Sequence, residues 1–483
     1  MATLRKVTAN TLLYSISQIL QRGSSVIFFP IFSFYLTQSD YGIQSISSYI
    51  SGYCFVLAGF ELNRAVSRLI YEEQADGEFV KRLMGTMFLF QLIVFAFVSV
   101  VGLVIGPFAL QSLLNDIPFY PYMALTFMFM PLMAVFSLYK VYLQATHQGL
   151  QFMKVDLLFW GTNVGLNLLF VIAFHLHVEG LLLSTLISCV LFAAYAFYNL
   201  YRKTKLRIDK AILTRALQFS LPILPFIVTG TFLESMDKMV LNNQSGKDAA
   251  GIYYIAVMVA GFFSVLKESA ISAIQPWFYQ HFDKQTQQRT REVLQSLYLV
   301  LALLVIGISW FSFEMLHLLS RNPDLVEAYK YTPFIVNALL MVLLSQLETL
   351  IVYYRKKKIK WLVFTSLLAL FVNWQTATHL IPLYGITGAA ISYLCAMTVL
   401  AISTAFLTRS LKFHLNYWMI GTVSVLTFGL SIFPLVTHMP YIVLLCIKLL
   451  GSVILCSLLY MYLQRKFRIK ELGLQLWKEK FKS

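Results

Sequence analysis

The chain has 483 residues, of which 58% are apolar and only 12% are charged, and its formal net charge is +16. A soluble protein would carry about twice that charged fraction, so the water-soluble globular classes are excluded. Apolar runs of about 20 residues recur from end to end between short polar turns. We therefore predict an all-α polytopic membrane protein.

The apolar runs predict about 14 transmembrane helices. In chain order they lie near residues 10–36, 42–62, 83–108, 118–143, 155–175, 179–201, 217–241, 251–275, 292–315, 331–354, 361–381, 384–408, 416–437 and 440–463. Basic residues precede the first run, but no small-residue cleavage site follows it, so we expect an uncleaved first span.

The distribution of Lys and Arg predicts the orientation of these spans. Most of the 38 basic residues fall on one side of the predicted membrane, whereas Lys247, Arg321 and Lys330 fall on the other. The positive-inside rule then predicts that both termini are cytoplasmic. The positive charge is accounted for by this topology and by contact with anionic membrane lipids, so nucleic acid is not an expected partner.

The two halves of the sequence repeat each other at a nearly constant offset. "LTQSDYGIQSIS" corresponds to "LNNQSGKDAAGIYYIA", with Gly42 matching Gly251, and "VEGLLLSTLISC" corresponds to "ITGAAISYLCA". Six spans per repeat keep the copies parallel, which is typical of alternating-access carriers. We predict a six-helix lobe at 1–208, a second at 209–412, appended helices thirteen and fourteen at 413–463, and a basic cytoplasmic tail at 464–483.

Charged residues inside the predicted spans are the candidate functional groups, since a charge at mid-bilayer is costly unless it is used or paired. They occupy spans one and two and the matching spans seven and eight, so they are predicted to line one cavity between the lobes. The basic candidates for an anionic substrate are Arg22, Lys238, Lys267, Arg64 and Arg68. The acidic candidates for ion coupling are Glu234, Asp237, Glu268 and Glu61.

Structural alternatives exist for several of these charges. Glu234 and Lys238 lie at i and i+4, so they could simply neutralise one another, and Lys267 could do the same with Glu268. Arg64 and Arg68 could instead snorkel to the lipid headgroups. Lys448, deep in the last span, could snorkel or face a lipid groove.

Uncharged polar residues and prolines add weaker candidates. Asn163, Asn167, Asn373 and Gln375 are of the kind that bind sugar hydroxyls. Hydrogen bonds between helices are an equally good explanation of them. Pro222 and Pro225 lie early in the seventh span, where they are expected to kink the helix and serve a gate. No spacing of Cys or His predicts a metal site.

These segments resemble bacterial polysaccharide flippases of the O-antigen (Wzx-like) type. The resemblance is carried by Leu221-Pro222 with Pro225, by Asp237-Lys238 and by Gly251-Ile252-Tyr253. "LTQSDYGIQSI", "NRAVSRLIYEE" with Arg68, "IQPWFYQ" and "LIPLYGITGAAIS" are also similar to the family, so that the resemblance runs over roughly residues 5–410.

The resemblance implies membership of the multidrug/oligosaccharidyl-lipid/polysaccharide (MOP) exporter superfamily. It implies a MATE-like fold of two six-helix lobes with extra C-terminal helices, and transport of undecaprenyl-diphosphate-linked oligosaccharide from the cytoplasmic to the periplasmic leaflet. A coupling cation, Na⁺ or H⁺, is expected, with no other cofactor. A polysaccharide polymerase and chain-length proteins are the implied protein partners. Lys238, with Arg22 and Lys267, is expected to attract the diphosphate or anionic sugars.

Other functions remain open on the sequence. A lipid II flippase would share the predicted spans, and a cation-coupled multidrug or small-molecule exporter of the same superfamily would usually have twelve of them. A membrane glycosyltransferase or glycan polymerase is disfavoured, because no predicted loop has room for a catalytic site. We therefore expect a transporter and not an enzyme.

Overall fold

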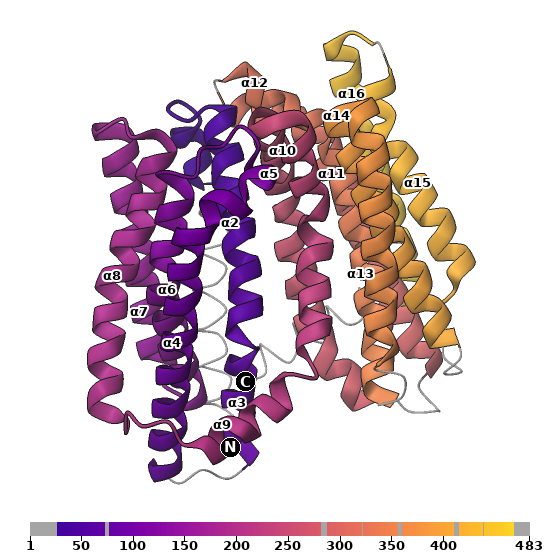
Figure 1. Ribbon diagram of the computed structural model, residues 1–483. Coiled ribbons are helices and arrows are strands. Elements are labelled where there is room, and N and C mark those ends of the chain that lie inside the picture. The colour runs from indigo at the N-terminus through magenta and orange to yellow at the C-terminus, as the bar shows by residue number, and fades with distance from the viewer. Residues whose placement is uncertain are drawn as a thin grey trace, which may run out of the picture. The chain divides into compact units, whose positions relative to one another are not determined.

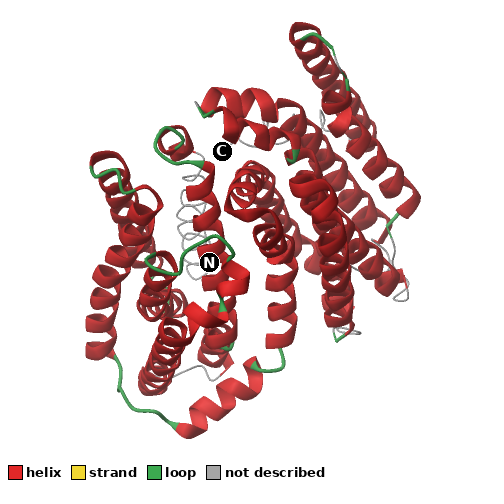
Figure 2. Ribbon diagram, turned by 45° about the horizontal axis from the view of Figure 1, so that its top comes forward, coloured by secondary structure: helices red, strands yellow, loops and turns green. Residues whose placement is uncertain are grey.

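The computed structural model describes residues 27–72, 77–281, 287–320, 322–355, 360–409, 415–437 and 439–467. Helices joined by short turns and loops make up these ranges, and the described residues form no β-strand (Figure 2). The predicted all-α class is confirmed. The residues group into two compact units, which are described separately: unit 1 comprises Met1–Met258, Leu319–Leu325 and Ser366–Tyr393, and unit 2 comprises Val259–Leu318, Val326–Thr365 and Leu394–Ser483.

Unit 1 is a bundle built around α6 (Figure 1). Its helices include α2 (Gln38–Gly59), α3 (Leu62–Glu72), α4 (Gly77–Ala109), α5 (Gln111–Leu114), α6 (Tyr122–Ala145), α7 (Gly149–Leu168) with the π turn η1 (Leu169–Ala173), α8 (His177–Lys203), α9 (Lys210–Ser220), the first part of α10 (Leu224–His281) and residues 366–393 of α14 (Trp361–Arg409). The helix α6 packs against α2, α4, α7 and α8. Buried aromatic side chains such as Phe88, Phe136 and Tyr139 fill the space between them.

Unit 2 contains the end of α10, α11 (Gln287–Leu319), the 3₁₀ turn η2 (Glu327–Lys330), α13 (Thr332–Arg355), parts of α14 (Trp361–Arg409), α15 (Tyr417–Val436) and α16 (Tyr441–Phe467). The short α12 (Pro323–Val326) precedes η2. Helix α13 is the most enclosed of these candidate membrane spans, whereas most of α16 is exposed. The long helices α10 and α14 contribute to both units and leave helical geometry at Gly246 and Gly385.

Ten of the described helices are long and apolar enough to cross a membrane, so the chain is a multi-pass membrane protein. Two of the ten, α10 and α14, have 58 and 49 residues and bend at a glycine, and each therefore has the length of two spans. Helix α2, at the predicted second span, is not sufficiently apolar to be among the ten. Most of the first predicted span, 10–26, lies outside the described residues, and the count of fourteen stays a prediction.

Two local expectations were wrong. The second span does not continue to Glu61, because Phe60 and Glu61 both adopt left-handed backbone angles and end α2 at Gly59. Glu61 therefore precedes a separate helix, α3, which carries Arg64 and Arg68. The seventh span is not one kinked helix either: α9 ends at Ser220, a turn covers residues 221–223, and α10 begins at Leu224. Pro222 lies in that turn, and Pro225 lies in the first turn of α10, where a missing amide hydrogen costs little.

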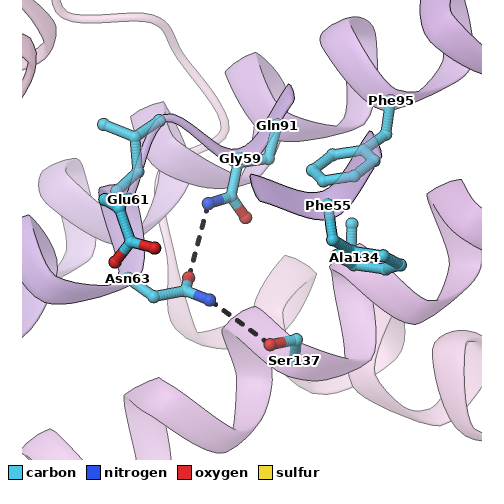
Figure 3. A pocket seen from close by; sticks show the side chains of 9 residues that line it. Phe55, Gly59, Glu61, Asn63, Gln91, Phe95, Ala134 and Ser137 are labelled. Atoms are coloured by element: carbon cyan, nitrogen blue, oxygen red, sulfur yellow. Dashed lines mark hydrogen bonds between the residues drawn. The ribbon is translucent and has the colours of Figure 1, made fainter. Parts of the chain in front are cut away.

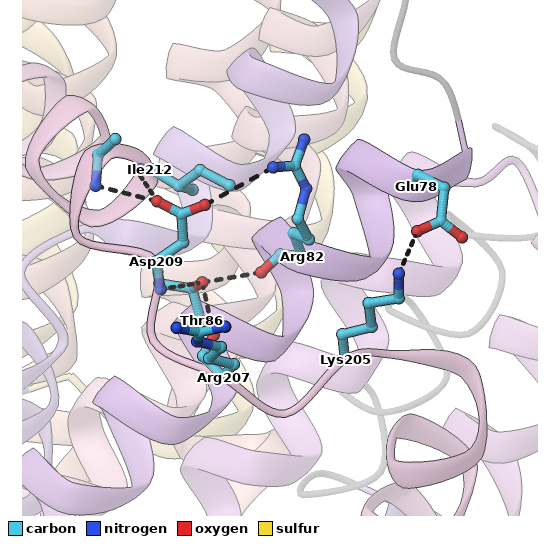
Figure 4. A network of polar contacts seen from close by, with 8 residues as sticks. Glu78, Arg82, Thr86, Lys205, Arg207, Asp209 and Ile212 are labelled. Atoms are coloured by element: carbon cyan, nitrogen blue, oxygen red, sulfur yellow. Dashed lines mark hydrogen bonds and ion pairs between the residues drawn. The ribbon is translucent and has the colours of Figure 1, made fainter.

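The predicted lobe boundaries at 208 and 412 stay a prediction. The segment that joins the predicted lobes is held against α4 by contacts of Lys205 and Asp209 (Figure 4). Asp209 caps α9 and lies 3.8 Å from a guanidinium nitrogen of Arg82, and its amide donates to Thr86 of α4. Lys205 forms a 2.7 Å ion pair with Glu78. A Cβ on Gly85 would lie 1.9 Å from the Lys205 carbonyl oxygen, so only glycine permits this approach.

Candidate functional site

The two matched glycines of the sequence repeat meet in unit 1. A Cβ on Gly251 would lie 1.8 Å from the carbonyl oxygen of Gln38, and one on Gly42 would lie 2.0 Å from that of Lys247. Backbones can approach this closely only where side chains are absent. The start of α2 in the first repeat therefore packs directly against the part of α10 that follows the Gly246 bend in the second repeat.

Polar contacts extend this junction between the repeats. The side-chain amide of Asn242 donates to the carbonyls of Leu113 and Leu114, at 3.0 and 3.3 Å, at the end of α5. The amide of Lys247 donates to Asp116 at 3.3 Å, and its ammonium lies 3.8 Å from the same carboxylate. These contacts join two turns that are predicted to lie on the side of the membrane opposite the basic loops. We call this set of contacts the turn junction.

Farther along α2, aromatic contacts continue the same interface with α10. The Tyr53 ring stacks on Phe232 with centroids 4.3 Å apart, and its hydroxyl lies 2.6 Å from the Ser235 hydroxyl. Asn373 of α14 donates to the Leu233 carbonyl at 3.1 Å. Span two of the first repeat and span seven of the second repeat are therefore in side-chain contact within unit 1.

Asp237 and Lys238 lie at the centre of this interface. Asp237 is fully buried, at 0% exposure, and Lys238 is 6% exposed. The Lys238 ammonium lies 3.3 Å from one Asp237 carboxylate oxygen, and the Tyr253 hydroxyl donates to the other at 2.6 Å. The ammonium also lies 4.7 Å from the Tyr393 ring centroid and 5.8 Å from that of Tyr49. We call these five residues the tyrosine cage.

Within the tyrosine cage, the acidic partner of Lys238 is Asp237. The sequence suggested the carboxylate of Glu234, but the structure pairs Lys238 with that of Asp237, and from Glu234 the ammonium contacts the backbone carbonyl. The Glu234 side chain is exposed. Burying two charges is costly unless they are paired and hydrogen-bonded. Both conditions hold here, and the ring faces add cation–π attraction for the ammonium.

A polar pocket opens at the other end of α2 (Figure 3). Its cavity volume is about 70 Å³, and Glu61, Asn63, Gln91 and Ser137 supply its polar groups beside apolar lining residues such as Phe55 and Phe95. Asn63 links the set, because it accepts from Gln91 at 3.4 Å and donates to Ser137 at 3.3 Å. The uncharged side chains of this pocket, Asn63, Gln91 and Ser137, are of the kind that donate hydrogen bonds to hydroxyl groups and accept them. The sequence analysis missed three of these residues, since their spacing along the chain carries no signal.

The predicted basic residues of the first repeat differ in their surroundings. Arg64 forms a 2.8 Å ion pair with Glu61 and its side chain is 58% exposed. Arg68 is also exposed, and its guanidinium stacks 4.2 Å above the Phe219 ring of α9. Arg22 lies outside the described residues. Whether these residues bind substrate stays a prediction.

In unit 2, the pair predicted between Lys267 and Glu268 is present. The two charged groups lie 2.8 Å apart, and Gln346 of α13 also donates to Glu268, at 3.0 Å. Lys267 is buried whereas Glu268 is half-exposed. The acid of this pair is therefore the more accessible partner.

Two of the four uncharged candidates make hydrogen bonds between helices. Asn163 of α7 donates to Thr185 of α8 at 3.5 Å and accepts from Asn167 at 3.1 Å. Asn373 makes the α14-to-α10 contact given above, and Gln375 is half-buried, with its backbone carbonyl accepting from the Thr378 hydroxyl. The helix-contact explanation is thus present in the structure for Asn163 and Asn373, whereas Asn167 bonds within α7, and glycan contact stays a prediction.

Two acids in unit 2, the partly buried Glu314 and the fully buried Glu348, were not identified from the sequence. Glu314 of α11 lies 2.7 Å from the ammonium of Lys448, so Lys448 neither snorkels nor faces lipid but is paired, at 3% exposure. Glu348 of α13 is fully buried and accepts from Thr408 of α14. In the described parts of the chain, no group of three or more His, Cys, Asp or Glu side chains could hold a metal ion.

Comparison with known proteins identifies the family. A family model described as "Polysaccharide biosynthesis protein" matches residues 7–282, more than half of the chain. The chain belongs to the polysaccharide biosynthesis protein family. By sequence, no curated protein matches it. The resemblance noted in the sequence is therefore confirmed at the level of this family.

Solved structures with the same fold are transporters of the MOP superfamily. The lipid II flippase MurJ in an inward closed conformation superimposes with a TM-score of 0.71 and 12% identity, over 94% of this chain and 99% of that chain. An inward-facing multidrug resistance MATE family transporter of the MOP superfamily superimposes with a TM-score of 0.67 and 14% sequence identity. The match covers 83% of this chain and 97% of that chain. A third match is a MOP superfamily transporter from Pyrococcus furiosus, which is described as having a binding pocket of reverse polarity. Its TM-score is 0.53 and its sequence identity is 15%, over 83% of this chain and 95% of that chain. Because these sequence identities are low, the structural likeness establishes the MATE-like fold of this chain and not its substrate.

Proposed function

We propose that this protein is a flippase that moves lipid-diphosphate-linked oligosaccharide from the cytoplasmic to the periplasmic leaflet of a bacterial inner membrane. Undecaprenyl diphosphate is the expected carrier lipid. The observation that carries the proposal is the family match, and the fold shared with MurJ and MATE transporters supports it. Both termini are placed in the cytoplasm by the distribution of basic residues. A polysaccharide polymerase and chain-length proteins are proposed to act on the product.

The proposed mechanism is alternating access between the two repeats. In that mechanism the turn junction and the tyrosine cage close the periplasmic end in one state and separate in the other. Separation would bring water to Asp237 and Lys238, and the ammonium would then be available to a diphosphate. In this mechanism, opening of the periplasmic end weakens the ion pair between Asp237 and Lys238, and the Lys238 ammonium becomes able to attract the substrate diphosphate.

The experiment is complementation in the source bacterium. The gene is deleted, and surface polysaccharide is measured after return of the wild type or of the double variant Asp237→Asn with Lys238→Met. The double variant removes both charges and leaves no buried charge unpaired. We expect wild type to restore the polysaccharide and the double variant to fail at equal membrane abundance.

A matched control is Lys330→Ala, which removes an exposed ion pair with Glu327 in η2 and should restore surface polysaccharide fully. Full rescue by the double variant would reduce Asp237 and Lys238 to a structural pair. Unchanged surface polysaccharide after deletion would exclude the proposed substrate class altogether.

The second candidate is a lipid II flippase, favoured by the extent of the structural match to MurJ. Its substrate is also a glycan on a lipid diphosphate, so the same basic groups would serve. The distinguishing test is growth of a strain depleted of its own lipid II flippase. Rescue of that strain, with no effect of deletion on surface polysaccharide, would favour the second candidate.

A further inference from the structure

Glu348 lies on α13 in the interior of unit 2. It is fully buried, and its carboxylate oxygen Oε2 accepts a hydrogen bond from the Thr408 hydroxyl of α14. The Tyr417 hydroxyl, from the first residue of α15, lies 3.1 Å from the Thr408 hydroxyl. The other carboxylate oxygen, Oε1, is buried without a hydrogen-bond partner among the described residues.

Three other carboxylates of low exposure in the described helices are each paired with a lysine. Asp156 lies 3.2 Å from Lys140, Asp237 lies 3.3 Å from Lys238, and Glu314 lies 2.7 Å from Lys448. Buried Asp40, at the start of α2, instead accepts from Thr37 and lies 3.6 Å from His177. No ion pair among the described residues includes Glu348. The groups that face it are the hydroxyls of Thr408 and Tyr417, and the adjacent Arg409 on α14 is exposed.

A fully buried carboxylate without a cationic partner is strongly disfavoured in its ionised form. It is stable when a proton or a small cation neutralises it, and carboxylate and hydroxyl oxygens are suitable ligands for either. The acids predicted from sequence to couple ions are less suitable. Asp237, Glu268 and Glu61 already have basic partners, and Glu234 is exposed.

We propose that Glu348, with Thr408 and Tyr417, forms a binding site for a monovalent cation, H⁺ or Na⁺. The site lies where α13, α14 and the first turn of the appended helix α15 meet. Its occupancy controls the contact among these three helices, because an emptied site leaves an uncompensated charge between them. Its role as the coupling site of transport rests on the proposed flippase function, whereas cation binding itself does not.

The test is infrared spectroscopy of the full-length protein in lipid nanodiscs at neutral pH. A protonated carboxyl group absorbs separately from an ionised carboxylate, so the Glu348 proton is directly observable. We expect a protonated-carboxyl band in wild type in sodium-free buffer, and its loss in Glu348→Gln. The matched control is Glu314→Gln, which should leave the band unchanged because the Glu314 carboxylate is ion-paired with Lys448.

Sodium titration separates the two cations. If H⁺ is the ligand, the band persists in Na⁺, and calorimetry detects no Na⁺ binding that depends on Glu348. If Na⁺ is the ligand, the band disappears as Na⁺ is added, and the binding heat is absent in Glu348→Gln. Absence of the band together with absence of Glu348-dependent Na⁺ binding would overturn the proposal.

A second variant covers the case in which Glu348→Gln does not fold. Thr408→Val keeps the acid but removes its hydroxyl donor, so the band or the Na⁺ affinity should shift without being lost. An unchanged band and affinity in Thr408→Val would also overturn the proposed site. The two proposals can fail separately, because cation binding is measured on purified protein and the flippase function is measured by surface polysaccharide.

Discussion

The carboxylates of Asp237 in unit 1 and Glu348 in unit 2 are equally inaccessible, each at 0% exposure, but only Asp237 has a lysine beside it. The Asp237 carboxylate also accepts a hydrogen bond from Tyr253, so both of its oxygens have partners. One oxygen of Glu348 has none among the described residues. Burial alone therefore does not predict what an intramembrane acid does. The charge beside it decides whether the acid is ionised and paired or must be neutralised.

The sharpest test of this difference is removal of the lysine in unit 1. Lys238→Met should lower the free energy of unfolding by about 3–5 kcal/mol, because it leaves Asp237 buried and uncompensated. Adding Asp237→Asn should recover most of that loss. Thermal unfolding of the purified protein measures both, and a double variant no more stable than Lys238→Met would contradict the pairing.

Glu314→Gln should produce the next largest effect. It leaves the Lys448 ammonium buried beside a neutral amide, at an expected cost of about 1–3 kcal/mol. Lys448→Met in the same chain should reverse part of this cost, again measured by thermal unfolding. An additive loss in the double variant would show that the two residues do not interact.

Glu348→Gln should be milder, although Glu348 is the most deeply buried of the acids in unit 2. If the carboxyl group is already neutral, exchange for an amide of similar shape should cost less than about 1.5 kcal/mol. The stability of the variant should also lose the dependence on pH or Na⁺ that wild type shows. A loss as large as that of Lys238→Met would indicate a different, strictly structural role.

Lys330→Ala should have the smallest effect and sets the baseline for the series. Its 2.9 Å pair with Glu327 is roughly half exposed on both sides, and such pairs contribute at most about 1 kcal/mol. Raising the salt concentration should reduce the stability difference from wild type further, because salt screens exposed charges. A larger loss would mean that exposed and buried pairs cannot be distinguished in this protein by mutation.

The fold was predictable because its signals are local. Apolar runs predicted the helices, and the repeat that matches Gly42 with Gly251 predicted two related halves whose glycines proved to lie in close backbone contact. The end of α2 was not predictable in the same way. Phe60 and Glu61 take left-handed backbone angles without the glycine or asparagine that would usually announce them.

The candidate site was predictable only in part, since pairing depends on residues far apart in the sequence. Asp237 and Lys238 are neighbours within an apolar stretch, so the sequence indicated their charges, although the pairing alternative that it offered for Lys238 was with Glu234 and not Asp237. Glu314 and Lys448 are separated by 134 positions, and neither gives a local indication of the other. Glu348 lies alone in an apolar span, and its hydroxyl neighbours come from two other helices.

The central claim is that the two repeats separate at the turn junction during transport. Asp116 and Lys247 make a suitable pair for locking it, because their side chains lie 3.8 Å apart on the two sides of that junction. Both would be changed to cysteine after replacement of the five native cysteines, and the thiols joined by a short cleavable reagent in proteoliposomes that contain a lipid-diphosphate-linked glycan. The account predicts that cross-linking stops the glycan from reaching the opposite leaflet and that cleaving the link restores movement. Undiminished movement with the link intact would contradict it.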